Sequence, residues 1–482
     1  MRFIKYYYLI EQVFNNWKSA LSQSQELKAA VDLMKEINRL GYECLIVGGS
    51  VRDLILGKVP NDIDLVTNIP PSEIEKHFET HDIGKNKAFG VSVVKYKGFI
   101  FELANYRADL YDKIGGKGAD RVEIVSDFKS DVLRRDYSIN GLGIDADGNI
   151  IDHVGGLKDI ENKIISSIGD PNLRFKEDQV RTLRGVRFAS RLGFTIDPKT
   201  AEAIKSNAPE IKNVAMERVL KELWKMAEQS GERFANAIIM LKDLNLLQYI
   251  IPELLDMRKM KHSEINHPEG ERDEEGDPTV WGHTIEALKT YKGNDPVVNF
   301  AILLHDIGKT KTHALSDSGK HTYHGHAKES GKMIDEIGKR LRMNNKTIEA
   351  IKFVADNHMN YFDIPKMNNK TVAQLLRSPY FDILEQVALA DSKARGASHD
   401  ENEWKEIQDK IVKVKELVKG KDVIDAVKKV VNGALIMRLR PDIKPGPDMG
   451  KIINDTIEYV INNEIDLDNM ETITDYVENW KK

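Results

Sequence analysis

Residues 47–68 read VGGSVRDLILGKVPNDIDLVTN, and this stretch decides the fold of the N-terminal part of the chain. The apolar run YECLIV at 42–47 leads into two glycines and then SVRDLIL, an order that predicts a strand, a tight turn and a helix. Backbone N–H groups at such a turn, around Gly48 and Gly49, can come close to phosphate groups. Arg52, in the first turns of the helix, can add a charged hydrogen bond to a phosphate.

The second half of the stretch predicts a strand that carries two carboxylates on one face. In NDIDLVT at 61–67, strand alternation points Asp62 and Asp64 to the same side. Adjacent carboxylates repel unless a cation lies between them, and Mg²⁺ is held in this way beside substrate phosphates. Glu102, in the predicted strand FIFELANY at 99–106, can supply a third carboxylate, although a plain surface glutamate is an equally open interpretation.

Composition describes a soluble chain with room for several packed units. The 482 residues are 41% hydrophobic and 30% charged, which suggests about three or four domains. The net charge of −5 argues against non-specific binding of nucleic acid by the whole surface of the chain, but it does not exclude local basic faces. The single cysteine, Cys44, lies in an apolar run, so we expect a core residue and a reducing, cytoplasmic setting. Charges at Lys5 and Glu11 argue against a signal peptide, and no uncharged run approaches the roughly 20 residues of a membrane span.

Periodicity divides the chain into a mixed part and a helical part. Residues 11–41 have a helical pattern, strand-like and turn-like segments run to about Ile151, and from about Asn162 the pattern is helical with little strand character. The polar runs at 267–279 and 438–450 are the expected linkers.

Taken together, GGSVRDLILG and NDIDLVT resemble the signature of the class II tRNA nucleotidyltransferases and related bacterial poly(A) polymerases, within the polymerase-beta-like superfamily. The resemblance continues through LRRDYSINGLGID (133–145), EDQVRTLRGVRFASRLGF (177–194) and AMERVLKEL (215–223), and it returns at 430–465. It implies an α+β fold, with a small mixed α/β head followed by an all-α neck, body, HD domain and tail. The stretch LYDKIGGKGAD at 110–120 departs from the basic segment usual there.

The resemblance assigns roles to residues of this sequence. It implies that Asp62 and Asp64 hold catalytic Mg²⁺, and the strand placement of Glu102 makes it our candidate for a third catalytic carboxylate. The residues that would bind the nucleotide are Gly48, Gly49, Arg52, one of Arg134 and Arg135, and the readers of base and triphosphate, Asp178, Arg181, Arg184 and Arg187.

The pair Asp178 and Arg181 also makes chemical sense from first principles. The two residues are three apart on a predicted helix and therefore share a face. Cytosine and adenine each present an amino donor beside a ring-nitrogen acceptor, which a carboxylate and a guanidinium complement together. Guanine and uracil present the reverse pattern and would leave buried groups unpaired. A surface salt bridge on an ordinary helix is the alternative interpretation.

A second chemical centre is predicted downstream, because ten of the 13 histidines fall between His262 and His399. A His–Asp doublet joined by distant histidines and aspartates is typical of a divalent transition-metal site. The order resembles the HD phosphohydrolase superfamily, which implies Ni²⁺, Mn²⁺ or Co²⁺ on His283, His305, Asp306 and Asp391, and a second metal or a phosphate on His326 and His358. Five further histidines are expected on the surface, namely His262, His313, His321, His324 and His399. A polar insertion, GERDEEGDPTV, stands before His283.

The expected segments are an N-terminal helical extension (1–41), the catalytic head (42–160), a base-reading neck (161–225), a helical body (226–262), the HD domain (263–400) and a helical tail (401–482). The expected function is template-independent addition of CCA, from CTP and ATP, to tRNA 3′ ends, with an HD phosphohydrolase that acts on RNA-end phosphates and no membrane partner. A poly(A) polymerase and an HD phosphohydrolase with an RNA-binding head stay open as alternatives.

Overall fold

The computed structural model describes residues 2–81, 90–110, 121–261, 272–273, 276–319, 321–395, 400–417, 423–463, 465 and 469–481. The chain forms two compact units, the first made of residues 1–229 and 233–252 and the second of residues 230–232 and 253–482. The predicted linker at 438–450 is no boundary, because it joins two helices within the second unit. Most of the predicted linker at 267–279 lies outside the described residues.

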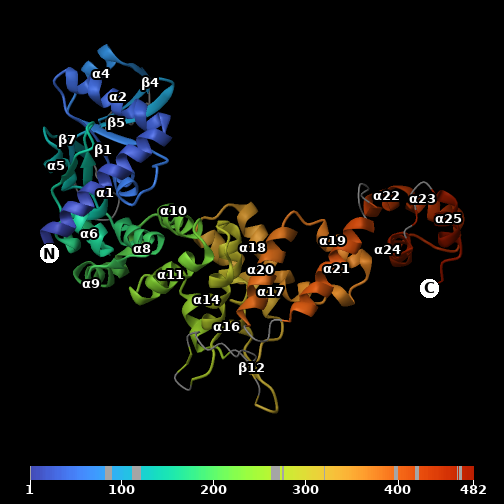
Figure 1. The fold of residues 1–482 in the computed structure, drawn as a ribbon. Coiled ribbons are helices and arrows are strands. Elements are labelled where there is room, and N and C mark those ends of the chain that lie inside the picture. Colours follow the sequence, from blue (N-terminus) through green and yellow to red (C-terminus); the bar gives the residue numbers. More distant parts are fainter. Residues whose placement is uncertain are drawn as a thin grey trace. The chain divides into compact units, whose positions relative to one another are not determined.

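A seven-stranded mixed sheet in the order β3-β4-β5-β2-β1-β8-β9 forms the centre of the head (Figure 1). Its strands are β1 (Cys44–Val47), β2 (Asp64–Thr67), β3 (Glu79–His81), β4 (Val91–Tyr96), β5 (Phe99–Asn105), β8 (Leu142–Ile144) and β9 (Ile150–Asp152). Strand β2 pairs antiparallel with β1 and parallel with β5, where Leu65 is opposite Leu103. This register sets Asp64 level with Glu102. Strands β6 (Arg107–Leu110) and β7 (Arg121–Ile124) form a separate antiparallel pair.

The two N-terminal helices, α1 (Arg2–Gln23) and α2 (Gln25–Arg39), belong to the head. Helix α2 buries an apolar face against β1 and β5, and the Tyr96 hydroxyl donates to Glu36 of this helix at 2.5 Å. The Trp17 ring of α1 lies against Gly148, where an added Cβ would be only 2.6 Å from the ring. The described residues of the predicted extension are therefore an integral part of the head.

The head core lies between the sheet and the surrounding helices. Cys44 is buried, as predicted. One cluster of buried side chains consists of Leu45, Val47, Val66, Tyr106, Phe128, Val132 and Ile168.

Helices dominate the rest of the first unit, as the periodicity predicts. They are α3 (Gly49–Ile55), α4 (Pro71–His77), α5 (Phe128–Val132), α6 (Gly156–Asn162), α7 (Pro171–Glu177), α8 (Val180–Leu192), α9 (Pro198–Asn207), α10 (Met216–Ala227), α11 (Gly231–Asp243) and α12 (Leu247–Ile250). Helix α8 packs against α10 and ends at Gly193, whose φ of +68° is the left-handed conformation that glycine adopts without strain. A short parallel pair, β10 (Ile164–Ile165) with β11 (Thr195–Ile196), interrupts the helices.

Among its described residues, the second unit is helical apart from one small hairpin, β12 (Ala314–Leu315) with β13 (His321–Thr322). Its helices are α13 (Glu253–Asp256), α14 (Val280–Thr290), α15 (Pro296–Leu304), α16 (Lys309–Thr312), α17 (His326–Arg340), α18 (Asn345–Phe362), α19 (Asn369–Leu376), α20 (Phe381–Ala394), α21 (Glu401–Leu417), α22 (Val423–Val430), α23 (Gly433–Leu439), α24 (Pro447–Asn462) and α25 (Met470–Glu478). Helices α14, α15 and α18 all pack against α20. Within the described ranges, no helix has the length and apolar character that a bilayer crossing needs.

Candidate active site and metal centre

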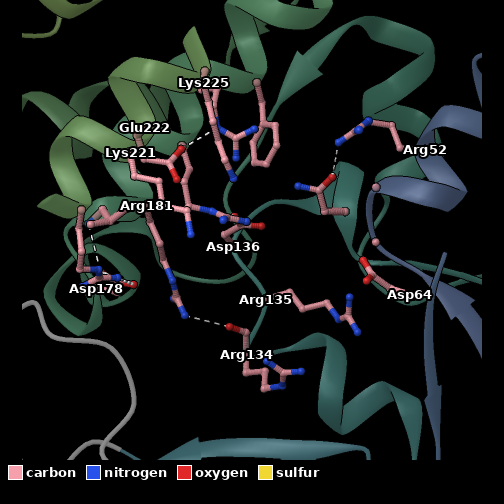
Figure 2. Close-up of a pocket in the computed structure, with 18 of the residues that line it drawn as sticks. Arg52, Asp64, Arg134, Arg135, Asp136, Asp178, Arg181, Lys221, Glu222 and Lys225 are labelled. Carbon is pink, nitrogen blue, oxygen red and sulfur yellow. Dashed lines mark hydrogen bonds and ion pairs between the residues drawn. The ribbon is translucent and has the colours of Figure 1, made fainter. Parts of the chain in front are cut away.

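A cavity of 790 Å³ opens between the sheet of the head and helices α8 and α10 (Figure 2). Eleven basic and five acidic side chains line it, so the lining carries an excess of positive charge. These charged residues are Arg52, Asp64, Arg107, Asp109, Arg134, Arg135, Asp136, Asp178, Arg181, Arg184, Arg187, Arg191, Arg218, Lys221, Glu222 and Lys225.

The glycine turn forms one edge of the cavity. Gly48 has a φ of +72°, a conformation in which a side chain would be strained, and an added Cβ would lie 3.6 Å from a carboxylate oxygen of Asp64, in van der Waals contact. Arg52 of α3 is 3% exposed and donates to Asn140 at 2.7 Å and to Asp53 at 2.8 Å. The guanidinium is thus fixed beside the turn.

The three predicted metal carboxylates lie around the start of β2. Asp62 and Asp64 are exposed and Ile63 between them is buried, as predicted, but β2 starts only at Asp64 and Asp62 lies in the bend before it. Although Asp64 is open to the cavity, partial desolvation by the protein around it raises its pKa. Arg135 lowers this pKa, and the carboxylates of Glu102 and Asp62 raise it further. Three oxygen-bearing anions within mutual influence suit Mg²⁺. Asp64 alone of the three lines the cavity, and in the described part of the chain the close groups of ligand atoms lie elsewhere.

One buried carboxylate holds both arginines of the LRRD motif. Asp131 is 0% exposed and accepts from Arg134 Nε at 2.9 Å and from Arg135 at 2.9 Å. The backbone N–H of Arg107 donates to the same side chain at 3.1 Å. Burial alone would raise the pKa of Asp131, but the two guanidinium groups outweigh it and keep the pKa below its ordinary value.

Asp178 and Arg181 both line the cavity, but the helical placement predicted for Asp178 is wrong. Asp178 follows α7 in an extended conformation and precedes α8. Its two carboxylate oxygens lie 2.8 and 3.0 Å from one nitrogen of Arg218. Arg181 donates instead to Glu177 at 3.0 Å and to the backbone carbonyl of Arg134 at 2.9 Å. The two side chains reach one cavity from a turn and a helix.

The predicted arginines of α8 continue along the cavity wall, and each is already paired. Arg184 Nε lies 2.6 Å from Asp136. Burial alone would raise the pKa of Asp136, but the charge of Arg184 outweighs it and the pKa is lowered. Arg187 Nε lies 2.6 Å from Glu222 of α10, and its guanidinium lies 4.3 Å from the centre of the Phe188 ring.

The sequence did not lead us to predict that one face of α10 lines the cavity, nor that Arg191 of α8 does so. A signal was present, because AMERVLKELWK places Arg218, Lys221 and Lys225 at spacings of three and four residues, which is one helix face. The residues of this face are Arg218, Lys221, Glu222 and Lys225.

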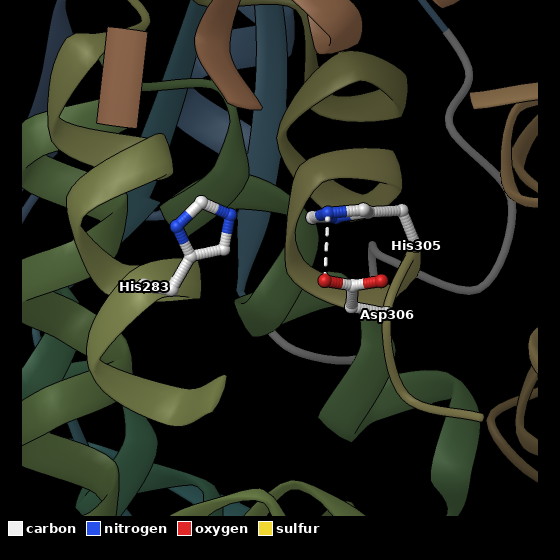
Figure 3. A group of neighbouring side chains, drawn as sticks. All are labelled: His283, His305 and Asp306. Atoms are coloured by element: carbon white, nitrogen blue, oxygen red, sulfur yellow. Dashed lines mark ion pairs between the residues drawn. The ribbon is translucent and has the colours of Figure 1, made fainter. Parts of the chain in front are cut away.

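A second centre lies in the second unit, where three predicted ligands from α14 and the end of α15 meet (Figure 3). The ligand atoms of His283, His305 and Asp306 lie within 4.8 Å of one another and are buried. A second such group shares Asp306 and adds His326 and His358.

Asp391 of α20 completes the six predicted residues. Its Oδ1 lies 2.6 Å from His283 Nε2 and 3.6 Å from His305 Nε2. Asp306 Oδ1 in turn lies 3.3 Å from His326 Nε2 and 3.5 Å from His358 Nε2. The structure therefore brings together side chains that are spread over more than a hundred residues of sequence.

Backbone hydrogen bonds fix the orientation of three imidazole rings of this group. His305, His326 and His358 each donate through Nδ1 to the backbone carbonyl three residues earlier, at 2.8, 2.9 and 2.7 Å. This leaves each Nε2 able to bind a cation. His305 Nε2 and Asp306 Oδ1 are buried and have no hydrogen-bond partner among the described residues. A divalent transition metal fits this mixed nitrogen and oxygen donor set.

Electrostatics around the centre favour positive charge. Burial lowers the pKa of His305, but the carboxylates of Asp306 and Asp391 outweigh it and raise the pKa to about 10. The pKa of each carboxyl is held well below its ordinary value against the effect of burial.

The other histidines do not join this centre in the described residues. His313 and His324 are exposed, as predicted, and His321 is half-buried on the hairpin with its Nδ1 2.7 Å from His313 Nε2. Outside the described residues lie His262, His399, the segment 111–120 and four residues of the insertion at 270–280, namely 270, 271, 274 and 275.

Family models match three parts of the chain. Residues 44–166 match the Poly A polymerase head domain, residues 193–258 match "Probable RNA and SrmB- binding site of polymerase A", and residues 280–414 match the HD domain.

Curated relatives are CCA-adding enzymes. That of Lactobacillus johnsonii is 36% identical over 274 residues, which cover 56% of this chain and 66% of the relative. That of Bacillus pumilus is 38% identical over 199 residues, or 41% of this chain and 49% of the relative. The chain thus matches about half to two thirds of the length of these relatives.

Solved structures confirm the α+β fold. The Bacillus stearothermophilus CCA-adding enzyme in complex with CTP aligns with a TM-score of 0.66 at 22% identity, over 94% of this chain and 97% of that chain. The Thermotoga maritima CCA-adding enzyme complexed with tRNA aligns with a TM-score of 0.58 at 17% identity, over 95% and 97%. From the motifs, the cavity and these matches together, the chain carries a Poly A polymerase head domain at residues 44–166 and an HD domain at residues 280–414, and it is similar to the CCA-adding enzymes.

Proposed function

We propose that this chain adds CCA, or part of it, to the 3′ ends of tRNA without a template, and that its HD centre removes phosphates from RNA ends. The observation that carries the proposal is a single cavity that joins the Gly48 turn and Asp64 to the pair Asp178 and Arg181. The CCA-adding relatives support tRNA, CTP and ATP as substrates.

In this proposal the head binds the reacting groups at the Asp64 end of the cavity. Asp62, Asp64 and Glu102 would hold Mg²⁺, which neutralises the phosphate charge and favours attack by a 3′ hydroxyl. The N–H groups of the glycine turn approach the triphosphate, and Arg52 and Arg135, fixed by their carboxylate and amide partners, bind its oxygens.

In this proposal, the end of the cavity that contains Asp178 and Arg181 selects the base of the incoming nucleotide. A carboxylate oxygen of Asp178 accepts from the amino group of cytosine or adenine, and Arg181 donates to the adjacent ring nitrogen. With guanine or uracil, an acceptor faces the carboxylate and a donor faces the guanidinium, so both buried groups lose a partner. The pair thereby admits CTP and ATP.

The HD centre serves RNA-end repair in this proposal. His283, His305, Asp306 and Asp391 would hold Ni²⁺, Mn²⁺ or Co²⁺, which activates water and neutralises a phosphate oxygen. His326 and His358 bind either a second ion or the phosphate. Removal of a terminal or cyclic phosphate exposes the hydroxyl that the head extends.

The test is nucleotide addition to a tRNA transcript that ends before its 3′ CCA. Each labelled nucleotide is supplied alone and then CTP with ATP, and products are resolved to single nucleotides. CCA addition predicts two C residues with CTP alone and a final A when ATP is present. The Asp64→Ala variant is the matched control and should add nothing, whereas full incorporation by this variant would contradict the catalytic assignment.

The same assay separates the alternatives. Long tails from ATP alone would identify a poly(A) polymerase, which shares the Poly A polymerase head domain. Tight RNA binding without incorporation of any nucleotide would identify an RNA-binding head that serves the HD domain.

A further inference from the structure

We propose that Arg191, Lys221 and Lys225 form a binding site for backbone phosphates of the RNA strand whose 3′ end is extended. These three residues are called the neck cation cluster. The proposal rests on the proposed function and assigns the RNA to a part of the cavity that the nucleotide does not use.

Two packed helices bring rows of cations to one wall of the cavity. On α8 and on α10 the spacing is the same, with steps of three and four residues that keep each row on one helix face. All six side chains line the cavity, and Figure 2 shows Lys221 and Lys225 projecting from α10. The rows are Arg184, Arg187 and Arg191 on α8, and Arg218, Lys221 and Lys225 on α10.

Three of these six cations are neutralised within the protein. The ion pairs are Arg184 with Asp136 at 2.6 Å, Arg187 with Glu222 at 2.6 Å and Arg218 with Asp178 at 2.8 Å. Each carboxylate that lines this wall is engaged in one of them. The neck cation cluster has no ion pair or side-chain hydrogen bond with any described residue.

The positive charges of the neck cation cluster repel one another. Lys221 and Lys225 are four residues apart on α10, a spacing at which like charges destabilise a helix. The pKa of the half-buried Lys225 is lowered, first by burial and then by Arg187 and Lys221, although Glu222 opposes this. A bound anion would offset this repulsion, so the neck cation cluster favours an anionic ligand.

The remaining anion of the reaction is the RNA backbone. The triphosphate is assigned to the edge formed by Gly48, Arg52 and Arg135, next to Asp64. Lys221 is exposed and Arg191 is half-buried, so the cluster is open to a strand that arrives from solvent. Contacts to phosphate position a strand without reading its bases. Such contacts suit an enzyme that must accept tRNAs with different sequences next to the added end.

The experiment measures binding of a fluorescent tRNA transcript that lacks its 3′ CCA, by anisotropy, in EDTA to prevent reaction and over a range of KCl concentrations. The full chain is compared with Arg191→Ala, Lys221→Ala and the double variant Lys221→Ala/Lys225→Ala. The double variant should bind about tenfold more weakly, and the slope of log Kd against log salt should fall by about 0.7 for each lost contact to a single strand. The KM for CTP should stay unchanged.

Two controls separate a phosphate site from a general loss of charge or of folding. Lys205 is an exposed lysine of α9 that does not line the cavity, so Lys205→Ala should leave the RNA Kd unchanged. Lys221→Arg/Lys225→Arg keeps both charges and should restore most of the affinity. Because Lys221 is exposed, its single replacement keeps the test valid even if changes at Lys225 disturb packing.

Unchanged RNA affinity and salt slope in the alanine variants would overturn the inference. It would also be overturned if Lys205→Ala weakened binding equally, or if the KM for CTP rose while the RNA Kd stayed constant. Each of these outcomes leaves CCA addition intact, because the proposed function fails only if the wild-type chain adds no nucleotide.

Discussion

At the scale of single residues, the carboxylate of Asp131 matters because it orients two cavity arginines although it does not itself line the cavity. Replacement by asparagine leaves Arg134 and Arg135 facing a neutral amide. Breaking a buried ion pair by removing one partner costs about 3 kcal/mol of unfolding free energy. We expect a loss of this size in urea denaturation at pH 7, and an unchanged midpoint would contradict it.

The same substitution has a pH signature. The folded-state pKa of Asp131 is lowered, so its contribution to stability is present above the unfolded pKa of about 4 and is lost as the pH falls through the folded value. The stability difference between wild type and Asp131→Asn should therefore narrow below about pH 4. A constant difference down to acid pH would show that the charge on Asp131 is not responsible.

Asp178 is expected to determine which bases are accepted. Asp178→Ala should lose discrimination against GTP and UTP by about 10- to 100-fold, because the variant no longer penalises a misplaced acceptor. The measurement is kcat/KM for each of the four nucleotides. Arg218→Ala should act in the same direction but less strongly, since it frees the carboxylate without removing it. Selectivity that survives both substitutions would exclude this site from base reading.

Residue types and motifs predicted much of the lining of this cavity, but local geometry did not follow from spacing. The run EDQVR contains no helix breaker, so a continuous helix was the natural prediction. In the fold, the Asp178 carboxylate accepts from the backbone N–H of Val180 at 3.1 Å, as a capping aspartate does, and a new helix starts there. The partner Arg218 lies forty residues further along the chain and could be found only from tertiary structure.

At the scale of elements, the strands were the most predictable part. The alternating runs VSVVKY and FIFELANY correspond to β4 and β5 almost residue for residue. The helical pattern of residues 11–41 was also correct, yet periodicity shows only that a helix has an apolar face and not what covers it. That α2 packs on β1 and β5 had to come from the fold.

Helices α18 and α20 together support the candidate metal centre through Arg395. Its guanidinium lies 4.7 Å from the centre of the Phe362 ring at the end of α18 and 2.9 Å from Asp391 Oδ2, while Asp391 Oδ1 faces the histidines. Loss of a group that orients a metal ligand weakens binding by about 10- to 100-fold. Arg395→Ala should therefore lower Ni²⁺ affinity in isothermal titration calorimetry by a factor in this range.

A matched control is Arg377→Ala, which removes an exposed arginine paired with Asp425 of α22. This variant should bind Ni²⁺ as the wild type does. Equal affinities for all three proteins would rule out a role for Arg395 in the metal centre.

At the scale of the whole molecule, the two chemical centres use separate ligands in separate compact units. The double variant His305→Ala/Asp306→Ala should therefore extend a tRNA that ends in a free 3′ hydroxyl. It should fail on a tRNA that ends in a 2′,3′-cyclic phosphate, because that end offers no attacking oxygen. Gel analysis of both substrates gives the answer, with thermal melting to verify that the variant is folded.

The wild-type chain supplies the control for this experiment. It should process both substrates in the presence of a suitable divalent metal. If it left the cyclic phosphate intact with Mg²⁺, Mn²⁺, Ni²⁺ and Co²⁺ in turn, the repair role of the HD centre would be wrong.

Motifs predict the order of the domains, whereas the limits of each compact unit depend on tertiary structure. Each motif indicates a kind of domain but not where that domain ends. The polar run at 438–450, for example, is typical of a linker between domains, although here it only joins α23 to α24. The boundary between the two compact units near residue 252 is set by contacts between residues that are distant in sequence. A local sequence pattern cannot predict such contacts.

The packing of Trp17 against Gly148 has a practical consequence for studying the head. The chain has five tryptophans, at positions 17, 224, 281, 404 and 480, so the first 223 residues contain a single indole. Trp17 is 2% exposed, and its emission should shift to longer wavelength when α1 leaves the sheet domain. A chain that keeps Trp17 and carries phenylalanine at the other four positions thus contains a fluorescent reporter of head integrity that needs no substrate, label or turnover.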